Sequence, residues 1–209
     1  MELNEKQIQI LETAEILFAD QSYDGTSVRD IATKAGVNVA MISYYFGSKE
    51  KLLEALFSYR SEGTTLKLES MLQNKELSPM KKMDVMIDFF IDKFLNQQCF
   101  HKIMTREQVT SQRNVTSEFI GRFKKKNQLL VKRLIQEGQK SGDFNKNIDI
   151  PILMATLVGT VGHIVTTQHF YRELNDLQEM PDEQFQKLIR KKLSAHLKFL
   201  FKATLTHEI

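Results

Sequence analysis

The sequence predicts an all-α protein with two helical domains, residues 1–47 and 48–209. Three prolines and nine glycines are few for 209 residues, so long uninterrupted helices are possible. Apolar residues recur at intervals of three and four along most of the chain, whereas the alternation typical of β-strands is rare. A chain of this length can also bury a sizeable core.

The first domain is predicted to hold three helices. Asn4 to Asp20 forms the first, with one apolar face made by Ile8, Leu11, Leu17 and Phe18. Asp24 and Gly25 then form a turn. Ser27 stands three residues before Asp30, which is the spacing of a capping box and predicts the start of a second helix.

A glycine turn joins the second helix to the third. Gly36 lies where a helix–turn–helix needs left-handed backbone, and Asn38 is suited to cap the third helix. Ile42 and Phe46, one turn apart, are expected to anchor this helix in the core. The opposite face is then free to enter a groove of DNA. That face carries Val39, Ala40, Ser43 and Tyr44.

The segment from Thr26 to Leu52 follows the pattern T-S-V-x-x-I-A-x-x-A-G-V-x-x-x-x-I-x-Y-Y-F-G-S-K-E-x-L. This pattern resembles the amino-terminal domain of the TetR family of bacterial transcriptional regulators. The resemblance implies a homodimeric repressor that binds a palindromic operator in double-stranded DNA through residues 1–47. It further implies that a small-molecule effector, bound within residues 48–209, controls the affinity for DNA.

The candidate DNA contacts come from two helices and the residues just beyond them. Asn38 and its neighbouring amides are suited to a phosphate at a helix amino terminus. Val39 and Ala40 are small enough to approach base edges and thymine methyl groups, and Ser43 and Tyr44 face the same groove. The residues suited to hold the opposite strand are Thr26, Ser27 and Arg29. The resemblance adds two phosphate contacts, Tyr45 and Lys49.

The charge distribution argues against this interpretation. Residues 1–50 contain four Lys or Arg and eight Asp or Glu, a net charge of −4, although the whole chain is at +3. DNA-binding domains are usually basic. The motif is the stronger signal, because phosphate contacts need only local donors. The alternative is a helical protein-interaction module without specific DNA binding.

Further helices are predicted along the second domain. Pro79 follows Ser78 and marks a break, since proline is tolerated at the first position of a helix. The predicted helices run from Ser48 to Leu72, Met80 to Leu95, Phe100 to Thr110, Thr116 or Ser117 to Ser141, and from about Phe185 to Leu200.

No formally charged residue lies between Asp149 and Arg172. The length would suffice to span a bilayer, but its histidine, glutamine and threonine side chains would be costly in lipid. We therefore expect no membrane insertion and predict a helix that is buried on most sides. Together with the last helix it is expected to form a dimer interface. The predicted interface residues are Ala155, Gly159, Gly162, Thr166, Ile189, Leu193 and Leu197.

An apolar effector could bind among aromatic and methionine side chains from three helices. For any one of these residues, packing in the core is the commoner role. The candidate ligand contacts are Met86, Phe90, Phe94, Met104, Phe119, Phe123 and His163.

Metal binding and catalysis are not expected. His163 and His169 are six residues apart and do not share a helix face, so they form a poor metal pair. The chain lacks the common nucleotide-binding and hydrolase motifs. An enzyme with the apolar pocket as its active site is the weakest of the alternatives. Cys99 is the single cysteine, which excludes an internal disulfide and suits the cytoplasm. No cofactor is expected.

Overall fold

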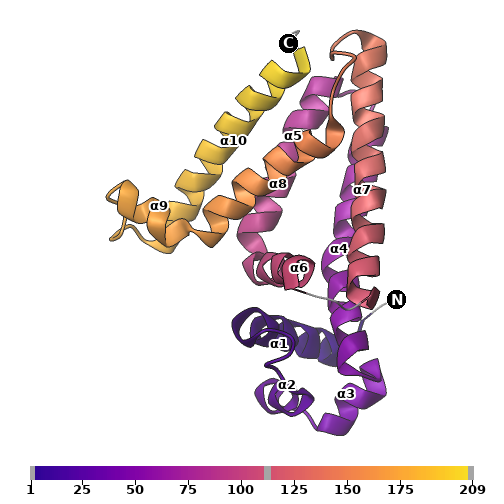
Figure 1. Cartoon of the computed structure of the whole chain (residues 1–209), viewed down its shortest axis with the longest axis vertical. Coiled ribbons are helices and arrows are strands. Elements are labelled where there is room, and N and C mark those ends of the chain that lie inside the picture. Colours follow the sequence, from indigo (N-terminus) through magenta and orange to yellow (C-terminus); the bar gives the residue numbers. More distant parts are fainter. Residues whose placement is uncertain (1–2, 111–113, 207–209) are drawn as a thin grey trace. The chain divides into compact units, whose positions relative to one another are not determined.

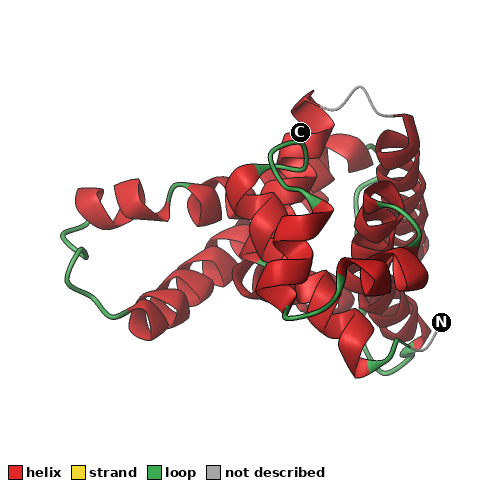
Figure 2. Cartoon of the chain, turned by 90° about the horizontal axis from the view of Figure 1, so that it is seen from below, coloured by secondary structure: helices red, strands yellow, loops and turns green. Residues whose placement is uncertain are grey.

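The computed structural model describes residues 3–110 and 114–206, and it leaves the side chains of residues 110–119 undescribed. Every regular element in these ranges is a helix, and the helices are joined by loops (Figures 1 and 2). The helices are α1 (Glu5–Gln21), α2 (Val28–Ala35), α3 (Val39–Phe46), α4 (Lys49–Gln73), α5 (Pro79–Asn96), α6 (Gln98–Thr110), α7 (Asn114–Ser141), α8 (Ile150–Thr166), α9 (Gln168–Leu174) and α10 (Asp182–Thr206). The prediction of an all-α fold is confirmed.

The helices form two compact units, each with its own core. Unit 1 comprises Met1–Thr64 and Cys99–Lys124, and unit 2 comprises Thr65–Gln98 and Lys125–Ile209. The helices α4 and α7 contribute residues to both units. The boundary predicted after residue 47 separates a DNA-binding domain from the rest of the chain, which is a different criterion from the packing that defines these two units. That boundary stays a prediction.

The core of unit 1 joins the first three helices to the beginning of α4 and to α6. Leu11, Phe18 and Ile31 are buried in it, together with Phe57 of α4 and Phe100 of α6. The rings of Phe57 and Phe100 meet edge to face with centroids 5.4 Å apart. The helix α6 therefore belongs to the same hydrophobic cluster as the three amino-terminal helices.

In unit 2, α5 packs against α8 and α10 (Figure 1). The contact with α10 is closed by polar pairs: Arg190 binds both carboxylate oxygens of Asp92, at 2.5 and 2.8 Å. One turn away on α5, Asp88 accepts hydrogen bonds from Ser194, at 2.6 Å, and from Lys198. These pairs fix the register of α10 along α5.

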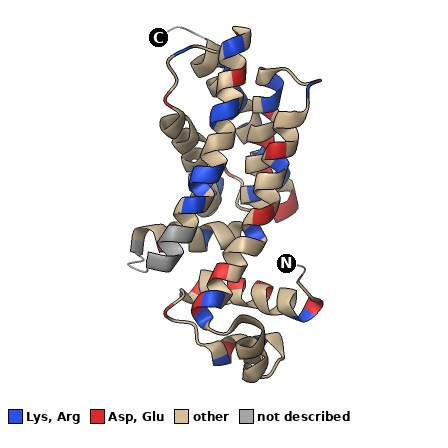
Figure 3. Cartoon of the chain, turned by 90° about the vertical axis from the view of Figure 1, so that its right-hand side faces the viewer, with Lys and Arg blue, Asp and Glu red and all other residues tan. Residues whose placement is uncertain are grey.

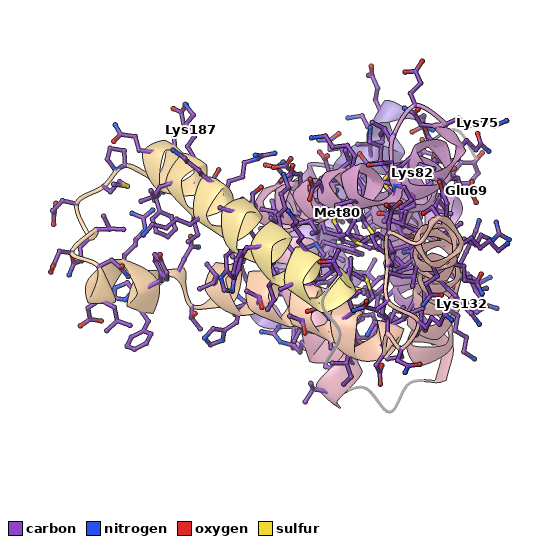
Figure 4. All side chains as sticks on the ribbon, turned by 90° about the horizontal axis from the view of Figure 1, so that it is seen from above. Glu69, Lys75, Met80, Lys82, Lys132 and Lys187 are labelled. Atoms are coloured by element: carbon purple, nitrogen blue, oxygen red, sulfur yellow. The ribbon has the colours of Figure 1, made fainter. Side chains whose placement is uncertain are left out.

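Unit 2 also buries a lysine. Lys82 of α5 is only 2% exposed, and its Nζ lies 2.7 and 3.0 Å from the carboxylate oxygens of Glu137 on α7. The same ammonium donates to the carbonyl oxygen of Leu72, at 3.0 Å, near the end of α4. Figure 4 shows Lys82 among the helices and Lys132 at the periphery. A buried cation needs such partners because its desolvation is expensive.

The uncharged segment is two helices, not one. The helices α8 and α9 meet at Thr167 with a bend of 77°. The hydroxyl of Thr167 donates to the carbonyl of His163 at 2.7 Å, and that of Thr166 donates to the carbonyl of Gly162 at 2.8 Å. Both hydroxyls satisfy carbonyl groups of the last turn of α8, where the helix ends.

The expectation that this segment is buried on most sides is wrong for the single chain. Only one stripe of α8 is buried, namely Leu153, Leu157, Val161 and Val165. Among the described residues, no single helix is long and apolar enough to cross a membrane, and only the bent pair α8 and α9 meets that test together.

Candidate nucleic-acid interface

The second helix of unit 1 begins where the sequence predicts. The Ser27 hydroxyl oxygen accepts from the backbone N–H of Asp30 at 3.1 Å, while the Asp30 carboxylate accepts from the backbone N–H of Ser27 at 2.8 Å. These reciprocal bonds form a capping box. Hydrogen bonding to the Ser27 hydroxyl and backbone N–H also lowers the pKa of Asp30. The acidic side chain is therefore used to begin the helix.

The turn into α3 depends on glycine and asparagine. Gly36 adopts the left-handed conformation with φ of 62°, and its backbone N–H donates to carbonyls of the last turn of α2. Asn38 then caps α3 by accepting from the backbone N–H of Ala40 at 2.9 Å. Gly47, with φ of 79°, ends α3. Since glycine reaches positive φ without steric cost, both ends of α3 are set by the local sequence.

The helix α3 is anchored on one face and exposed on the other. Ile42 and Phe46 are buried in the core of unit 1, as predicted. Tyr44 is 84% exposed, and its ring meets that of half-buried Tyr45 edge to face at 5.3 Å. The other exposed residues of this surface are Ser27, Arg29, Asn38, Val39, Ala40 and Ser43. We call this set, with Tyr44 and Tyr45, the α3 surface. Its residues have the exposure that contact with DNA requires, and the contacts themselves stay predictions.

Thr26 does not belong to this surface. Its side chain is only 1% exposed, and its hydroxyl donates to the carbonyls of Leu17, at 3.2 Å, and Ser22, at 2.8 Å. The prediction of a DNA contact from this side chain is therefore wrong. The residue closes the loop between α1 and α2.

Lys49 also has partners inside its own unit. Its Nζ donates to the backbone carbonyls of Tyr23 and Thr26, at 2.8 Å in both cases, and lies 4.1 Å from the centroid of the Tyr23 ring. This contact could not be predicted from the sequence, because no motif relates residues 26 positions apart.

The structure weakens the argument against DNA binding that rests on the net negative charge of residues 1–50. Arg60 of α4 lies outside the first 50 residues, and its guanidinium binds Glu15 at 2.6 Å and approaches Glu12 at 3.8 Å. Two acidic side chains of α1 therefore share an arginine that the count over residues 1–50 omits. Asp30 is likewise engaged in its helix cap.

Many Lys and Arg residues lie along α7, outside the α3 surface. Figure 3 shows Lys and Arg spaced along α7. The exposed ones are Arg122, Lys124, Lys125, Lys126, Lys132, Arg133 and Lys140. Lys125 and Lys132 line a surface hollow of about 650 Å³ with Leu129 and Pro151.

The predicted ligand contacts are divided between the two cores. Met86, Phe90 and Phe94 are buried in unit 2, and Met104 is buried in unit 1. Phe123 is half-buried in unit 1, whereas the side chain of Phe119 lies outside the described residues. His163 is exposed on α8, so it does not point into the core. Two hollows formed by described residues, one between α7 and the start of α8 and one on α1, are open to the surface, and neither is lined by a predicted contact.

The predicted dimer residues fall into two groups. Ile189, Leu193 and Leu197 of α10 are buried in their own unit, so their assignment to an interface between subunits is wrong. By contrast, Ala155, Gly159 and Thr166 are exposed on α8, and Gly162 is half-buried. The ring of Phe94 would lie 3.4 Å from a Cβ added at Gly162, whereas no atom lies within 4 Å of one at Gly159.

Cys99 has no feature of a nucleophile. Burial, together with the negative charges of Glu15 and Asp20, raises the pKa of its thiol. The reactive form of cysteine is the thiolate, so this environment disfavours nucleophilic chemistry. No group of three or more potential metal ligands occurs among the described residues.

A capped helix–turn–helix whose second helix presents an exposed face defines a DNA-binding protein. Residues 10–56 match the family of bacterial regulatory proteins called tetR, and residues 79–193 match the tetracyclin repressor-like carboxyl-terminal domain. The chain belongs to the TetR family of transcriptional regulators. Its amino-terminal part is the DNA-binding domain and its carboxyl-terminal part is a domain of the ligand-binding type. Members of this family are regulators and not enzymes.

Individual relatives agree with this assignment. The probable HTH-type transcriptional regulator YttP of Bacillus subtilis (strain 168) is 34% identical over 139 residues, which are 65% of this chain and 66% of that protein. The fatty acid degradation regulator FadR from Bacillus halodurans superposes with a TM-score of 0.71 at 22% identity, over 95% of this chain and 97% of that one. FadR from Bacillus subtilis in complex with stearoyl-CoA gives 0.67 at 22% identity, over 91% and 96%. At these identities the solved structures establish the fold alone.

Proposed function

We propose that this protein is a repressor that binds a palindromic operator as a homodimer through the α3 surface and responds to an apolar small molecule. The observation that carries the proposal is the division of α3 into a buried face, with Ile42 and Phe46, and an exposed face around Tyr44. A helix that is anchored on one side and exposed on the other can enter the major groove, which is wide enough for it.

Dimerisation follows from how short operators are recognised. A single α3 surface covers few base pairs, so two copies about 34–36 Å apart are needed to read both half-sites. The exposed small residues of α8, Ala155 and Gly159, permit close approach of a second helix. Phe199 of α10 is 75% exposed and is the largest apolar side chain available on that helix. We propose that these residues, in place of Ile189, Leu193 and Leu197, form the contact between subunits.

The dimer proposal has a direct test at Gly159. A Cβ added at this position meets no atom within 4 Å outside the adjoining backbone of α8, so Gly159→Leu should leave the subunit folded while it blocks the close approach. Sedimentation equilibrium should then show a weaker dimer. Gly63→Leu is the matched control, because Gly63 of α4 is equally open. Unchanged association of the Gly159 variant would exclude α8 from the interface.

The effector is proposed to be a molecule with a long hydrocarbon part. The support is the number of apolar side chains in unit 2, with Met86, Phe90 and Phe94 among them, and the likeness to regulators that are named for fatty acids. Stearoyl-CoA is the natural first probe because one similar structure contains it. A ligand of this kind would weaken DNA binding only as far as it prefers the conformation that does not bind DNA.

The main experiment is a titration of the DNA that flanks the protein's own gene. Binding to one fragment should be saturable and should fall steeply with salt, because phosphate contacts release counterions. Tyr44→Ala should weaken binding, whereas Leu66→Ala, an exposed position on α4, should not. Stearoyl-CoA should release the DNA fragment from the protein at a concentration at which coenzyme A without an acyl chain does not.

The alternative is that the α3 surface binds another protein. Such docking between apolar surfaces would be nearly independent of salt. Saturable binding of DNA with a steep salt dependence therefore separates the two functions. DNA binding that is weak and equal for every sequence would favour the alternative.

A further inference from the structure

Lys49 lies directly after α3 and reaches back to the loop before α2. It is the first residue of α4, and Ser48 caps that helix by accepting from the backbone N–H of Lys51 at 3.1 Å. From this position its Nζ donates to the carbonyls of Tyr23 and Thr26, both at 2.8 Å. The residue therefore connects the end of α3 with the loop between α1 and α2.

The loop on the other side of this contact is rigidly held. The Tyr23 ring packs against Phe18 with centroids 5.5 Å apart, and the buried Thr26 hydroxyl is bonded to the carbonyls of Leu17 and Ser22. Ser27, the next residue, caps α2. Lys49 thus binds the loop between α1 and α2. This loop is itself bonded to α1, and α2 begins directly after it.

The ammonium group of Lys49 lies among acceptors of its own unit. Two carbonyl oxygens converge on its ammonium group, and the face of the Tyr23 ring lies 4.1 Å from the nitrogen. Hydrogen bonds from charged donors and cation–π contacts are both stronger than their neutral counterparts in partly desolvated places. The side chain is half-buried, so it would lose these contacts if it turned toward a phosphate.

We infer that Lys49 is a positioning residue: with Tyr23 and the carbonyl of Thr26 it forms a clamp that fixes α3 relative to α2, and it is not a phosphate contact. The inference rests on the proposed binding of DNA by the α3 surface. It replaces the role that the family resemblance implied for this residue. The clamp holds both ends of the two-helix unit, since α2 begins beside Thr26 and α3 ends beside Lys49.

Salt dependence distinguishes a clamp from a phosphate contact. Loss of a phosphate contact reduces the slope of log K against log salt by about one per subunit. Loss of a positioning contact lowers affinity and leaves the slope unchanged. Lys49→Met removes the ammonium and keeps the length of the side chain, and Arg29→Met provides the reference for a lost contact on the α3 surface. Lys51→Met, an exposed lysine of the same helical turn, controls for the loss of charge.

The expected result for Lys49→Met is a loss of affinity of about tenfold, which corresponds to about 1.4 kcal/mol, at an unchanged slope. Tyr23→Leu should give a smaller loss, and Tyr23→Phe, which keeps the ring, should be close to the wild type. The double variant Lys49→Met with Tyr23→Leu should lose less than the sum of the single changes, because both remove the same contact.

Hydrogen exchange of the free protein gives a second measurement that needs no DNA. The amides at the start of α2 should exchange faster in Lys49→Met than in Lys51→Met. The inferred clamp would be overturned if the slope of log K against log salt fell as much in Lys49→Met as in Arg29→Met while the amides at the start of α2 exchanged at an unchanged rate. Absence of salt-dependent DNA binding in the wild type would instead refute the proposed function, and the exchange result would still decide whether Lys49 holds the loop.

Discussion

The helices α3 and α10 carry the same signal in the sequence, apolar residues one turn apart, but they differ in what the signal means. In α3, Ile42 and Phe46 are buried and the other face is exposed, as predicted. In α10, Leu193 and Leu197 were expected to meet a second subunit and are instead buried against their own. An apolar stripe shows that a face is covered, and it does not show which surface covers it.

The largest expected effect tests this distinction in α10. Leu197 is fully buried, so Leu197→Ala should lower the free energy of unfolding by about 2–5 kcal/mol. Phe199→Ala, two residues on, changes a side chain that is exposed in the single subunit, so it should lower the stability of the monomer by less than about 0.5 kcal/mol. Urea denaturation of both variants at several protein concentrations measures this. If Leu197→Ala lowers the free energy of unfolding only at concentrations at which the protein is dimeric, Leu197 belongs to the interface between subunits.

The second effect concerns the charge buried in unit 2. Glu137→Ala leaves the Lys82 ammonium with the Leu72 carbonyl alone, in a position that is 2% exposed. We expect a loss of about 1–3 kcal/mol in urea denaturation, at the lower end because Glu137 itself is partly exposed. Lys82→Met with Glu137→Gln removes both charges and should recover most of the loss. If the double variant is as unstable as Glu137→Ala, the cost does not come from the unpaired lysine.

The sequence predicts unit 1 better than unit 2 because its signals there are local. Ser27 with Asp30, Gly36 and Asn38 each act within a few residues, so their roles could be foreseen. The contact of Lys49 with Tyr23 and the pair of Lys82 with Glu137 join distant residues. No spacing in a single sequence reports such pairs.

The same reason explains the errors at the candidate sites. Thr26 precedes the cap and looks exposed in the motif, yet its hydroxyl is bound by carbonyls of α1 and the following loop. Ala155 and Gly159 of α8 are exposed, so their place at an interface stays a prediction, whereas the break at Thr167 was not predicted because threonine is common inside helices. The apolar contacts chosen for an effector were spread over two cores, since helical spacing says nothing about which helices meet.

A third prediction tests the local signals of unit 1. Ser27→Ala removes the hydroxyl that accepts from the backbone N–H of Asp30, so unit 1 should lose about 1 kcal/mol of stability. Thr33→Ala, an exposed change within the same helix, should not destabilise it. Thermal denaturation followed by circular dichroism compares the two. Equal melting temperatures would mean that the capping box is not what begins α2.

The smallest expected change in stability concerns the polar pairs between α5 and α10. These pairs join residues that are far apart in the sequence. Burial raises the pKa of Asp88, but hydrogen bonds from Lys198 and Ser194 and the charges of Lys198 and Arg190 outweigh it, so the pKa is lowered. A carboxyl whose folded pKa lies below its unfolded value, about 3.9, contributes stability above that value. The contribution is lost as the pH falls through the folded pKa.

Asp88→Asn should therefore be less stable than the wild type at pH 7, by less than about 1 kcal/mol because the pair is partly exposed. The difference should shrink below about pH 4 and disappear in stronger acid, as the wild-type carboxylate takes up its proton. Urea denaturation across this range measures it, and Lys198→Met should reduce the same pH dependence by removing the main partner. Parallel loss of stability in all three proteins would show that the α5–α10 contact is held by its apolar residues alone.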